Sequence, residues 1–266
     1  MRDTTRIIAV LGGLAIGLSA CAKAARPVMA RQVVGPIKVN CYLLYDERSR
    51  EAALIDVGGP VDELISVIKA KGLDLRYIFI THAHCDHVIG LPAARAAFPG
   101  AKLCFSREEY EDMASYERWE EKLPPQEVAQ MRTALLPGGD PELAALLTLD
   151  FDVAVGKPDI FAADGQAFAL GGLEVRATLS PGHSRGSLCY SVPGMLFSGD
   201  VLFAGQVGRT DLMDGGREAI VKSVRRLYSS FPDETRVYPG HGPATDIGTE
   251  KKANEEVSAS VVNIKN

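Results

Sequence analysis

All five histidines of this chain lie in three short segments that have the composition of metal sites. His82, His84 and His87 fall within six residues and share them with Asp86. Each of the other two, His183 and His241, directly follows a Pro-Gly pair. Neutral imidazole is the commonest metal ligand, and a neighbouring carboxylate suits zinc, iron or manganese. The sequence therefore predicts metal-assisted chemistry.

The first segment is predicted to lie between a strand and a helix. Residues 75–80 form a β-branched and aromatic run, and residues 88–98 carry apolar side chains at helical spacing. Side chains alternate along an extended segment, so His82 and His84 project to the same side, whereas Asp86 and His87 lie in the turn. Two such ligand pairs suit two metals.

The other candidates also follow predicted strands. Runs at 173–179, 195–199 and 235–238 end near His183, Asp200 and His241. Asp200 could bridge two cations, although alone it fits a turn aspartate equally well. Asp56, after the apolar run 52–55, could orient a ligand imidazole or serve only as a turn residue. A single histidine after Pro-Gly usually belongs to an ordinary loop, but three coinciding segments favour ligands.

The sequence resembles the metallo-β-lactamase superfamily, because its candidate ligands follow the family's order along the chain: His82-x-His84-x-Asp86-His87, then His183, Asp200 and His241. The likeness runs from about Gln32 to about Gly248, and residues 39–43, 208–212 and 238–243 look most like the short glyoxalase II-like hydrolases. The resemblance implies an α/β fold of the αββα kind, a four-layer sandwich of two mixed β-sheets flanked by helices.

The resemblance also implies two divalent metal ions, Zn²⁺ first, with Fe or Mn as alternatives. It assigns His82, His84 and His183 to one metal and Asp86, His87 and His241 to the other, with Asp200 bridging. A water between the metals would act as the nucleophile, and Asp86 could serve as a proton shuttle. Cys85 is expected to point away from the metal pair.

The leading function is therefore a dinuclear metal-dependent hydrolase of a thioester or another activated ester, glyoxalase II-like in chemistry. The alternative is a persulfide dioxygenase with a single iron, because residues 208–211 are shared with that branch. A lactonase or a non-catalytic metal-binding module ranks lower, as does a β-lactamase, since zinc β-lactamases usually carry a cysteine, or nothing comparable, where Asp200 stands. About 20 residues follow the His241 loop, so no C-terminal glutathione-binding domain is expected.

Composition predicts a single globular domain, and the family resemblance implies a small-molecule substrate. The chain has 266 residues, is 46% hydrophobic and carries a net charge of −5. Without a basic stripe, a nucleic-acid partner is not expected. The acidic stretch 108–121 predicts a solvated helix face. The oligomeric state stays open.

The N-terminus predicts an export signal. Arg2 and Arg6 precede an uncharged stretch, 7–20, that ends in a bacterial lipobox-like Leu18-Ser19-Ala20-Cys21. We expect a lipoprotein signal peptide at 1–20, a tether at 21–31, a catalytic domain at 32–266, and a cell-envelope protein facing the periplasm, with the membrane contacted only through a lipid anchor on Cys21. The alternative is a cytoplasmic protein translated from Met29.

Residues 106–157 read as a helical insertion broken by Pro and Gly, and this stretch is longer than expected in the short relatives. It could cap the site, with Tyr110, Trp119 and Met131 in the pocket wall, or could pack on the edge of the sandwich. Three of the cysteines, Cys41, Cys104 and Cys189, lie in apolar runs and are expected to be buried thiols.

Overall fold

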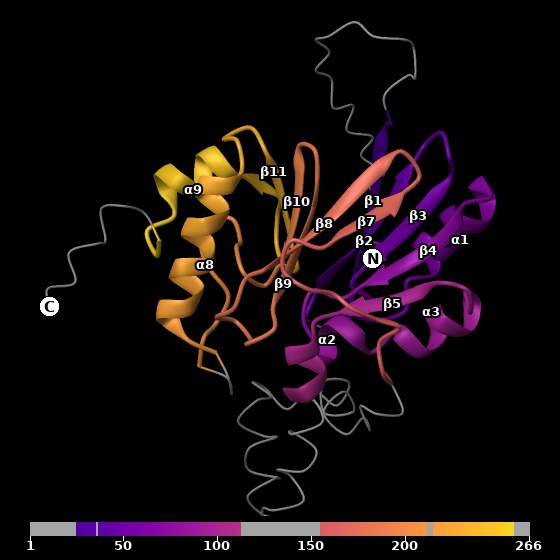
Figure 1. The fold of residues 1–266 in the computed structure, drawn as a ribbon, viewed down its shortest axis with the longest axis horizontal. Helices are drawn as coiled ribbons and strands as arrows, with labels where there is room; N and C mark the ends of the chain where they lie inside the picture. The colour runs from indigo at the N-terminus through magenta and orange to yellow at the C-terminus, as the bar shows by residue number, and fades with distance from the viewer. Residues whose placement is uncertain (1–24, 36, 113–154, 212–214, 258–266) are drawn as a thin grey trace, which may run out of the picture.

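The computed structural model describes residues 25–35, 37–112, 155–211 and 215–257. Two six-stranded mixed sheets lie face to face, and helices cover their outer faces (Figure 1). The αββα sandwich expected from the sequence is therefore confirmed.

The first sheet is formed by the N-terminal half of the chain. Its strands follow chain order: β1 (Pro27–Val34), β2 (Val39–Asp46), β3 (Glu51–Ile55), β4 (Asp74–Phe79), β5 (Lys102–Phe105) and β6 (Ile160–Phe161). The pairs from β1 to β3 are antiparallel, and those from β3 to β6 are parallel. Helices α1 (Asp62–Lys71) and α3 (Leu91–Ala97) lie in the connections between parallel strands.

The second sheet has the order β12-β11-β10-β9-β8-β7. Its strands are β7 (Ala167–Leu170), β8 (Leu173–Leu179), β9 (Leu188–Val192), β10 (Met195–Gly199), β11 (Arg236–Pro239) and β12 (Thr245–Asp246). Among the described strands of this sheet, only β10 and β11 pair in parallel, and helix α8 (Arg217–Ser230) lies in their connection. Helix α9 (Ile247–Ala253) follows β12.

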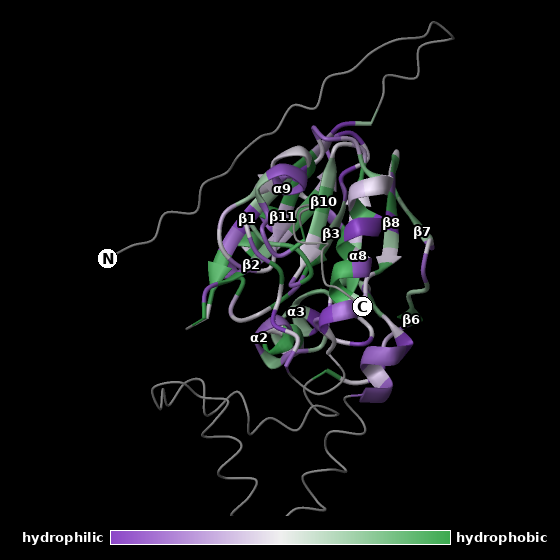
Figure 2. Cartoon of the chain, turned by 90° about the vertical axis from the view of Figure 1, so that its left-hand side faces the viewer, coloured by the Kyte–Doolittle hydropathy of each residue, from purple (hydrophilic) through white to green (hydrophobic). Residues whose placement is uncertain are grey.

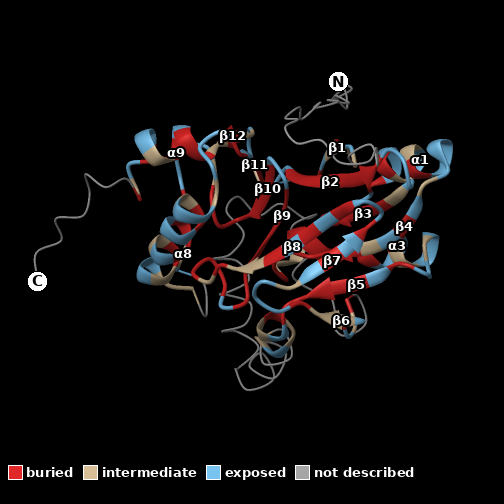
Figure 3. Cartoon of the chain, turned by 45° about the horizontal axis from the view of Figure 1, so that its top comes forward, coloured by how far each residue is buried: buried red, intermediate tan, exposed pale blue. Residues whose placement is uncertain are grey.

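Three buried apolar clusters hold the four layers together. One lies between the first sheet and its helices, the second between the sheets, and the third between the second sheet and α8. Strand β2 serves two of them, because Leu43 belongs to the first cluster and Leu44 to the second, as alternation along a strand requires. Both sheets are largely buried, whereas the helices carry exposed residues (Figure 3). Helix α8 likewise mixes hydrophobic and hydrophilic residues (Figure 2).

Two boundaries differ from expectation. Strand β1 begins at Pro27 and pairs along its whole length with β2, so residues 27–31, expected in the tether, belong to the sheet. The helix expected at 88–98 is divided into α2 (Cys85–Val88) and α3, with Gly90 between them. A Cβ on Gly90 would lie 2.1 Å from the carbonyl oxygen of Gly59, and this close approach of two backbones explains why the glycine stands at the break.

Several expectations lie outside the described residues, namely the signal segment with Cys21, Trp119, Met131 and most of the stretch 106–157. Tyr110 is described, and its ring packs on Phe105 and Phe161 beside the first cluster. In the described part of the chain, no helix has the length and apolar character needed to cross a membrane. Cys41, Cys104 and Cys189 are buried free thiols, as expected.

Candidate metal centre

The candidate ligands all lie in connections that follow strands. His82 and His84 stand between β4 and α2, while Asp86 and His87 form the first turn of α2. His183 lies beyond the end of β8. Asp200 directly follows β10, and His241 lies two residues after the end of β11. The structure brings all seven together in three overlapping groups: His82, His84 and His183; His82, His87 and Asp200; and Asp86, His87 and His241.

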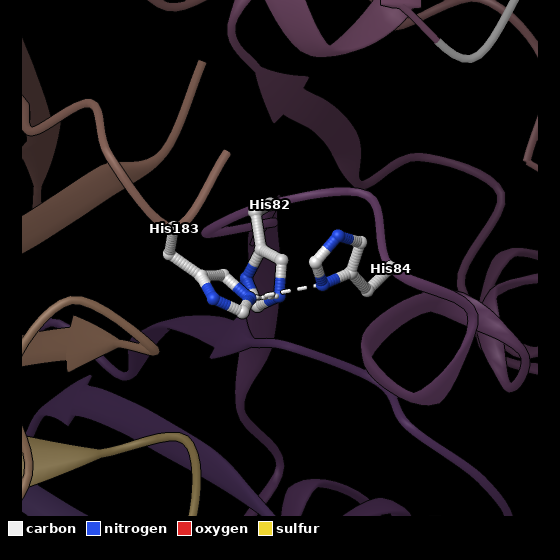
Figure 4. Close-up of side chains that lie close together, drawn as sticks. All are labelled: His82, His84 and His183. Carbon is white, nitrogen blue, oxygen red and sulfur yellow. Dashed lines mark hydrogen bonds between the residues drawn. The ribbon is translucent and has the colours of Figure 1, made fainter. Parts of the chain in front are cut away.

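The first group consists of the imidazoles of His82, His84 and His183, whose ring nitrogens converge (Figure 4). His183 Nε2 lies 3.1 Å from His82 Nε2 and 2.9 Å from His84 Nδ1. We call these three residues the first triad. Burial has the largest effect on the pKa of His82 and lowers it, and repulsion from the neighbouring imidazoles lowers it further. Burial and the His183 imidazole likewise bring the pKa of His84 to about 3. Burial also lowers the pKa of His183. The first triad is therefore neutral at pH 7, as metal ligands must be.

The second group combines one carboxylate with two imidazoles. Asp86 Oδ2 lies 3.2 Å from His241 Nε2 and 3.4 Å from His87 Nε2. We call Asp86, His87 and His241 the second triad. Burial opposes protonation of His87, but the carboxylates of Asp86, Asp200 and Asp56 outweigh it and raise its pKa. Burial likewise opposes ionisation of Asp86, yet the adjacent imidazoles lower its pKa.

Asp200 stands between the triads. Its Oδ1 lies 3.4 Å from His87 Nε2, and its Oδ2 lies 3.5 Å from His241 Nε2 and 3.7 Å from His183 Nε2. One carboxylate thus faces a nitrogen of the first triad and two nitrogens of the second. This is the placement that a bridging ligand needs.

Two buried polar atoms indicate that the group fits metal ions. His87 Nε2 and Asp200 Oδ1 have less than 1 Å² of exposed surface and no hydrogen-bond partner among the residues that the structure describes. An unpaired buried polar atom is costly, and these two atoms lie 3.4 Å apart at the centre of the ligand group. Nitrogen and carboxylate oxygen donors together form the ligand set that suits zinc, iron or manganese. These residues therefore fit two divalent cations.

The other ring nitrogen of four imidazoles is held by a fixed partner. His87 Nδ1 lies 2.9 Å from Asp56 Oδ2, and His82 Nδ1 lies 3.0 Å from Thr81 Oγ1. His183 Nδ1 donates to the carbonyl of Arg209 at 2.9 Å, and His241 Nδ1 donates to the carbonyl of Ile37 at 3.0 Å. Such contacts fix the tautomer and ring orientation of metal ligands, so Nε2 faces the centre in each case.

Asp56 has the orienting role that the sequence left open. Its Oδ1 accepts the Thr81 amide at 2.8 Å, and its Oδ2 accepts the Thr81 hydroxyl at 2.9 Å as well as contacting His87. The residue is buried and has a φ of 57°, a left-handed conformation that is rare for residues other than glycine. Asp56 therefore orients the His87 ring directly and the His82 ring through Thr81.

Strand β2 holds the His241 loop. The buried Asn40 side chain donates to the carbonyls of Pro239 at 2.8 Å and Gly242 at 3.0 Å, on either side of the histidine. Tyr42 Oη donates to the same Pro239 carbonyl at 2.6 Å. In the sequence, residues 39–43 stand out only through the family likeness, although a polar Asn40 within an apolar strand is a signal for this contact.

Gly240 has no room for a side chain. A Cβ there would lie 2.1 Å from Asp200 Oδ1 and 2.7 Å from the His87 ring. The Pro-Gly pair before His241 is therefore explained by close backbone approach to two other ligands.

Glu109 corrects an expectation and adds a residue that the sequence did not reveal. The acidic stretch was expected to form a solvated helix face, but the Glu109 carboxylate is buried, at 4% exposure. It accepts hydrogen bonds from both ligand loops of the first triad, and this contact between distant segments has no local sequence signal. Cys85 is not a member of the three ligand groups found among the described residues.

Comparison with known sequences agrees with this geometry. A family model described as the metallo-beta-lactamase superfamily matches residues 34–241. The probable metallo-hydrolase YqgX of Bacillus subtilis (strain 168) is 32% identical, over 84% of this chain and 94% of its own length. The hydroxyacylglutathione hydrolase GloC of Haemophilus influenzae is 32% identical, over 81% of this chain and 91% of its own length.

Solved structures show the same fold. The BLEG-1 B3 metallo-beta-lactamase aligns with a TM-score of 0.68 and 29% identity, over 87% of this chain and all of that one. TTHA1623, in a di-iron-bound form, aligns with a TM-score of 0.62 and 28% identity over 85% and 98% of the two chains. ETHE1 from Myxococcus xanthus, at 24% identity and a TM-score of 0.63 over 90% and 92%, shares the fold. The chain belongs to the metallo-beta-lactamase superfamily, whose members are generally metal-dependent hydrolases.

Proposed function

We propose that this protein is a dinuclear metal-dependent hydrolase that cleaves a thioester or another activated ester. The observation that carries the proposal is the Asp200 carboxylate, which faces His183 of the first triad and both histidines of the second. A site for one cation would need only one triad. Two bound cations would supply an activated water and polarise the substrate carbonyl.

The residues of the chain do the positioning. The first triad would hold one cation and the second triad the other, with Asp200 shared. The held Nδ1 atoms fix four rings before any ion binds, so little reorganisation is required. Asp86 Oδ2 contacts His241 and His87, and the lowered pKa of Asp86 makes its carboxylate a weak base. Its ligand role is thus better supported than a proton-shuttle role.

The ester class rests on relatives rather than on the site. GloC, named as a hydroxyacylglutathione hydrolase, makes glutathione thioesters the first substrates to test. BLEG-1, named as a B3 metallo-beta-lactamase, places β-lactams second. For the native metal we propose zinc, because three imidazoles form a typical zinc ligand set, with iron as the rival since TTHA1623 was solved with two irons.

The deciding experiment measures metal content and turnover together. The protein is purified without added metal, its ions are quantified, and it is assayed with a glutathione thioester, simpler thioesters, a lactone, a β-lactam and, for oxygen uptake, a persulfide. Two ions per chain with thioester hydrolysis would support the proposal. One iron per chain with oxygen uptake on a persulfide would replace it with a dioxygenase, and bound metal without any turnover would indicate a metal-binding module.

A further inference from the structure

The Glu109 carboxylate connects the two sheets beside the first triad. Glu109 lies in the helical stretch 107–112 that follows β5 of the first sheet. Its neighbours Arg107 and Glu111 are exposed, whereas Glu109 is buried and turned inward. A carboxylate is rarely buried unless its oxygens are paired, so its contacts define its role.

Each Glu109 oxygen pairs with a different ligand loop. Oε2 accepts the Ala83 amide at 2.8 Å, and Ala83 is the residue between His82 and His84. Oε1 accepts the Gly186 amide at 3.0 Å and the Ser184 hydroxyl, both just after His183. One side chain therefore fixes the distance between the two backbone segments that carry the whole first triad.

The surrounding contacts leave Glu109 little freedom. Its own amide donates to Ser106 Oγ at 3.1 Å. A Cβ on Gly186 would lie 2.3 Å from Ser106 Oγ and 2.6 Å from the Glu109 nitrogen, so the loop and the helix start are in direct contact. Ser184 Oγ also lies 2.6 Å from Ser187 Oγ, which in turn accepts the Ser184 amide. This network holds the loop after His183 against Glu109.

We propose that Glu109 is a positioning residue that keeps His183 in register with His82 and His84, and thereby sets the affinity of the first metal position. The inference rests on the proposed function in one respect, namely that the first triad binds a metal. The Glu109 carboxylate is hydrogen-bonded to Ala83, Gly186 and Ser184, which lie beside the ligands in the chain. It acts through the backbone of Ala83 and Gly186.

Glu109→Gln tests this directly, because an amide keeps the size of the carboxylate but accepts at one end only. Either the Ala83 or the Gly186 amide would then face an NH₂ group, so one loop must move. Asp46→Asn is the matched control. Asp46 is equally buried, and it accepts the amides of Arg26, Arg48 and Gly172 away from the ligand loops.

Both variants are prepared metal-free, alone and with His241→Ala, which removes one ligand of the second triad. Zn²⁺ affinity is measured by competition with a chromophoric chelator, and the Co²⁺ absorption spectrum is recorded. We call the ion held by the first triad the first ion and the one held by the second triad the second ion. We expect Glu109→Gln to weaken binding of the first ion by tenfold or more, within the roughly 10–100-fold range typical of groups that orient ligands. We also expect it to shift the Co²⁺ bands. We expect Asp46→Asn to lower Tm without either effect.

Unchanged first-ion affinity in Glu109→Gln would overturn the proposal. So would an Asp46→Asn variant that has the same Tm as Glu109→Gln and loses as much affinity for the first ion. If Glu109→Gln does not fold, Glu109→Asp decides, because it keeps the charge but shortens the side chain by one CH₂, so the two oxygens no longer reach both the Ala83 and the Gly186 amides. It should weaken the first ion measurably, and no change would overturn the proposal. Since affinity is measured without substrate, a wild-type protein that binds two ions but hydrolyses no ester would overturn only the proposed function.

Discussion

Asp56 Oδ2 lies 2.9 Å from His87 Nδ1, on the side of the ring opposite to the metal centre. The same carboxylate accepts both the amide and the hydroxyl of Thr81, which in turn contacts His82. One residue with a strained backbone therefore orients an imidazole from each triad. Conformational strain of this kind persists only where the surrounding contacts fix it.

Asp56→Asn should weaken binding of both ions, since an amide at the Oδ2 position would face the Thr81 hydroxyl and His87 Nδ1 with a donor. We expect a loss of roughly 10–100-fold in affinity, larger for the ion at His87 than for the one at His82. Isothermal titration of the metal-free protein measures both. Asp74→Asn, at an exposed ion pair with Arg76, is the control and should bind as wild type does. If Asp56→Asn binds both ions with wild-type affinity, Asp56 is only a turn residue and does not orient the ligands.

Asp200→Asn should reduce occupancy of the second ion and lower kcat by more than about tenfold, while the fold is retained. The reason is that Asp200 Oδ1 has no hydrogen-bond partner to lose, whereas its charge faces three imidazole nitrogens. Metal analysis, turnover and circular dichroism check the three parts. Two bound ions together with wild-type turnover would show that no bridging carboxylate is needed.

Asn40→Ala should weaken the second ion and spare the first. The substitution removes both donors that hold the carbonyls of Pro239 and Gly242 around His241. Loss of a buried partner costs about 1–3 kcal/mol, so Tm should also fall. The ratio of second-ion to first-ion affinity provides the internal control. An equal loss of both affinities would indicate general destabilisation instead.

Asp46→Asn should cost stability at neutral pH but not in acid. Burial opposes ionisation of Asp46, yet hydrogen bonds led by the Gly172 and Arg48 amides outweigh it and lower its pKa. A carboxyl whose pKa is lower in the folded state contributes stability above its unfolded value of 3.8, and this contribution disappears as the pH falls through the folded value. Urea denaturation at pH 7 and near pH 2 should therefore show a difference from wild type that shrinks in acid. A constant difference would contradict this account.

Lipid attachment at Cys21 is a separate proposal from the sequence. Full-length protein expressed in a Gram-negative host should partition with membranes and incorporate labelled fatty acid, whereas Cys21→Ser should stay unlabelled. Each buried CH₂ contributes about 0.8 kcal/mol, so two or more acyl chains would hold the protein on a bilayer. Soluble, unlabelled wild-type protein beginning at Met29 would overturn the anchor without affecting the metal centre. Metal content should be equal in the anchored protein and in Cys21→Ser.

The strand-end pattern made much of the fold predictable. The β-branched run before His82 became β4, and the alternating run 173–179 became β8 with the same bounds. The boundary at Pro27 was not predictable, because pairing with β2 rather than local composition extends β1 to that residue. The break at Gly90 likewise depends on contact with Gly59, which is distant in the sequence.

The sequence by itself determined which side chains form the centre, because few residue types bind transition metals and all five histidines stand in such motifs. Only the tertiary structure decided how they are shared and held. Asp200 lies beside His241 because β10 pairs with β11, and Asn40 reaches the His241 loop across about 200 residues of chain. Glu109 reads as one acidic residue among several, and its burial follows from two loops that meet only when the sheets pack together.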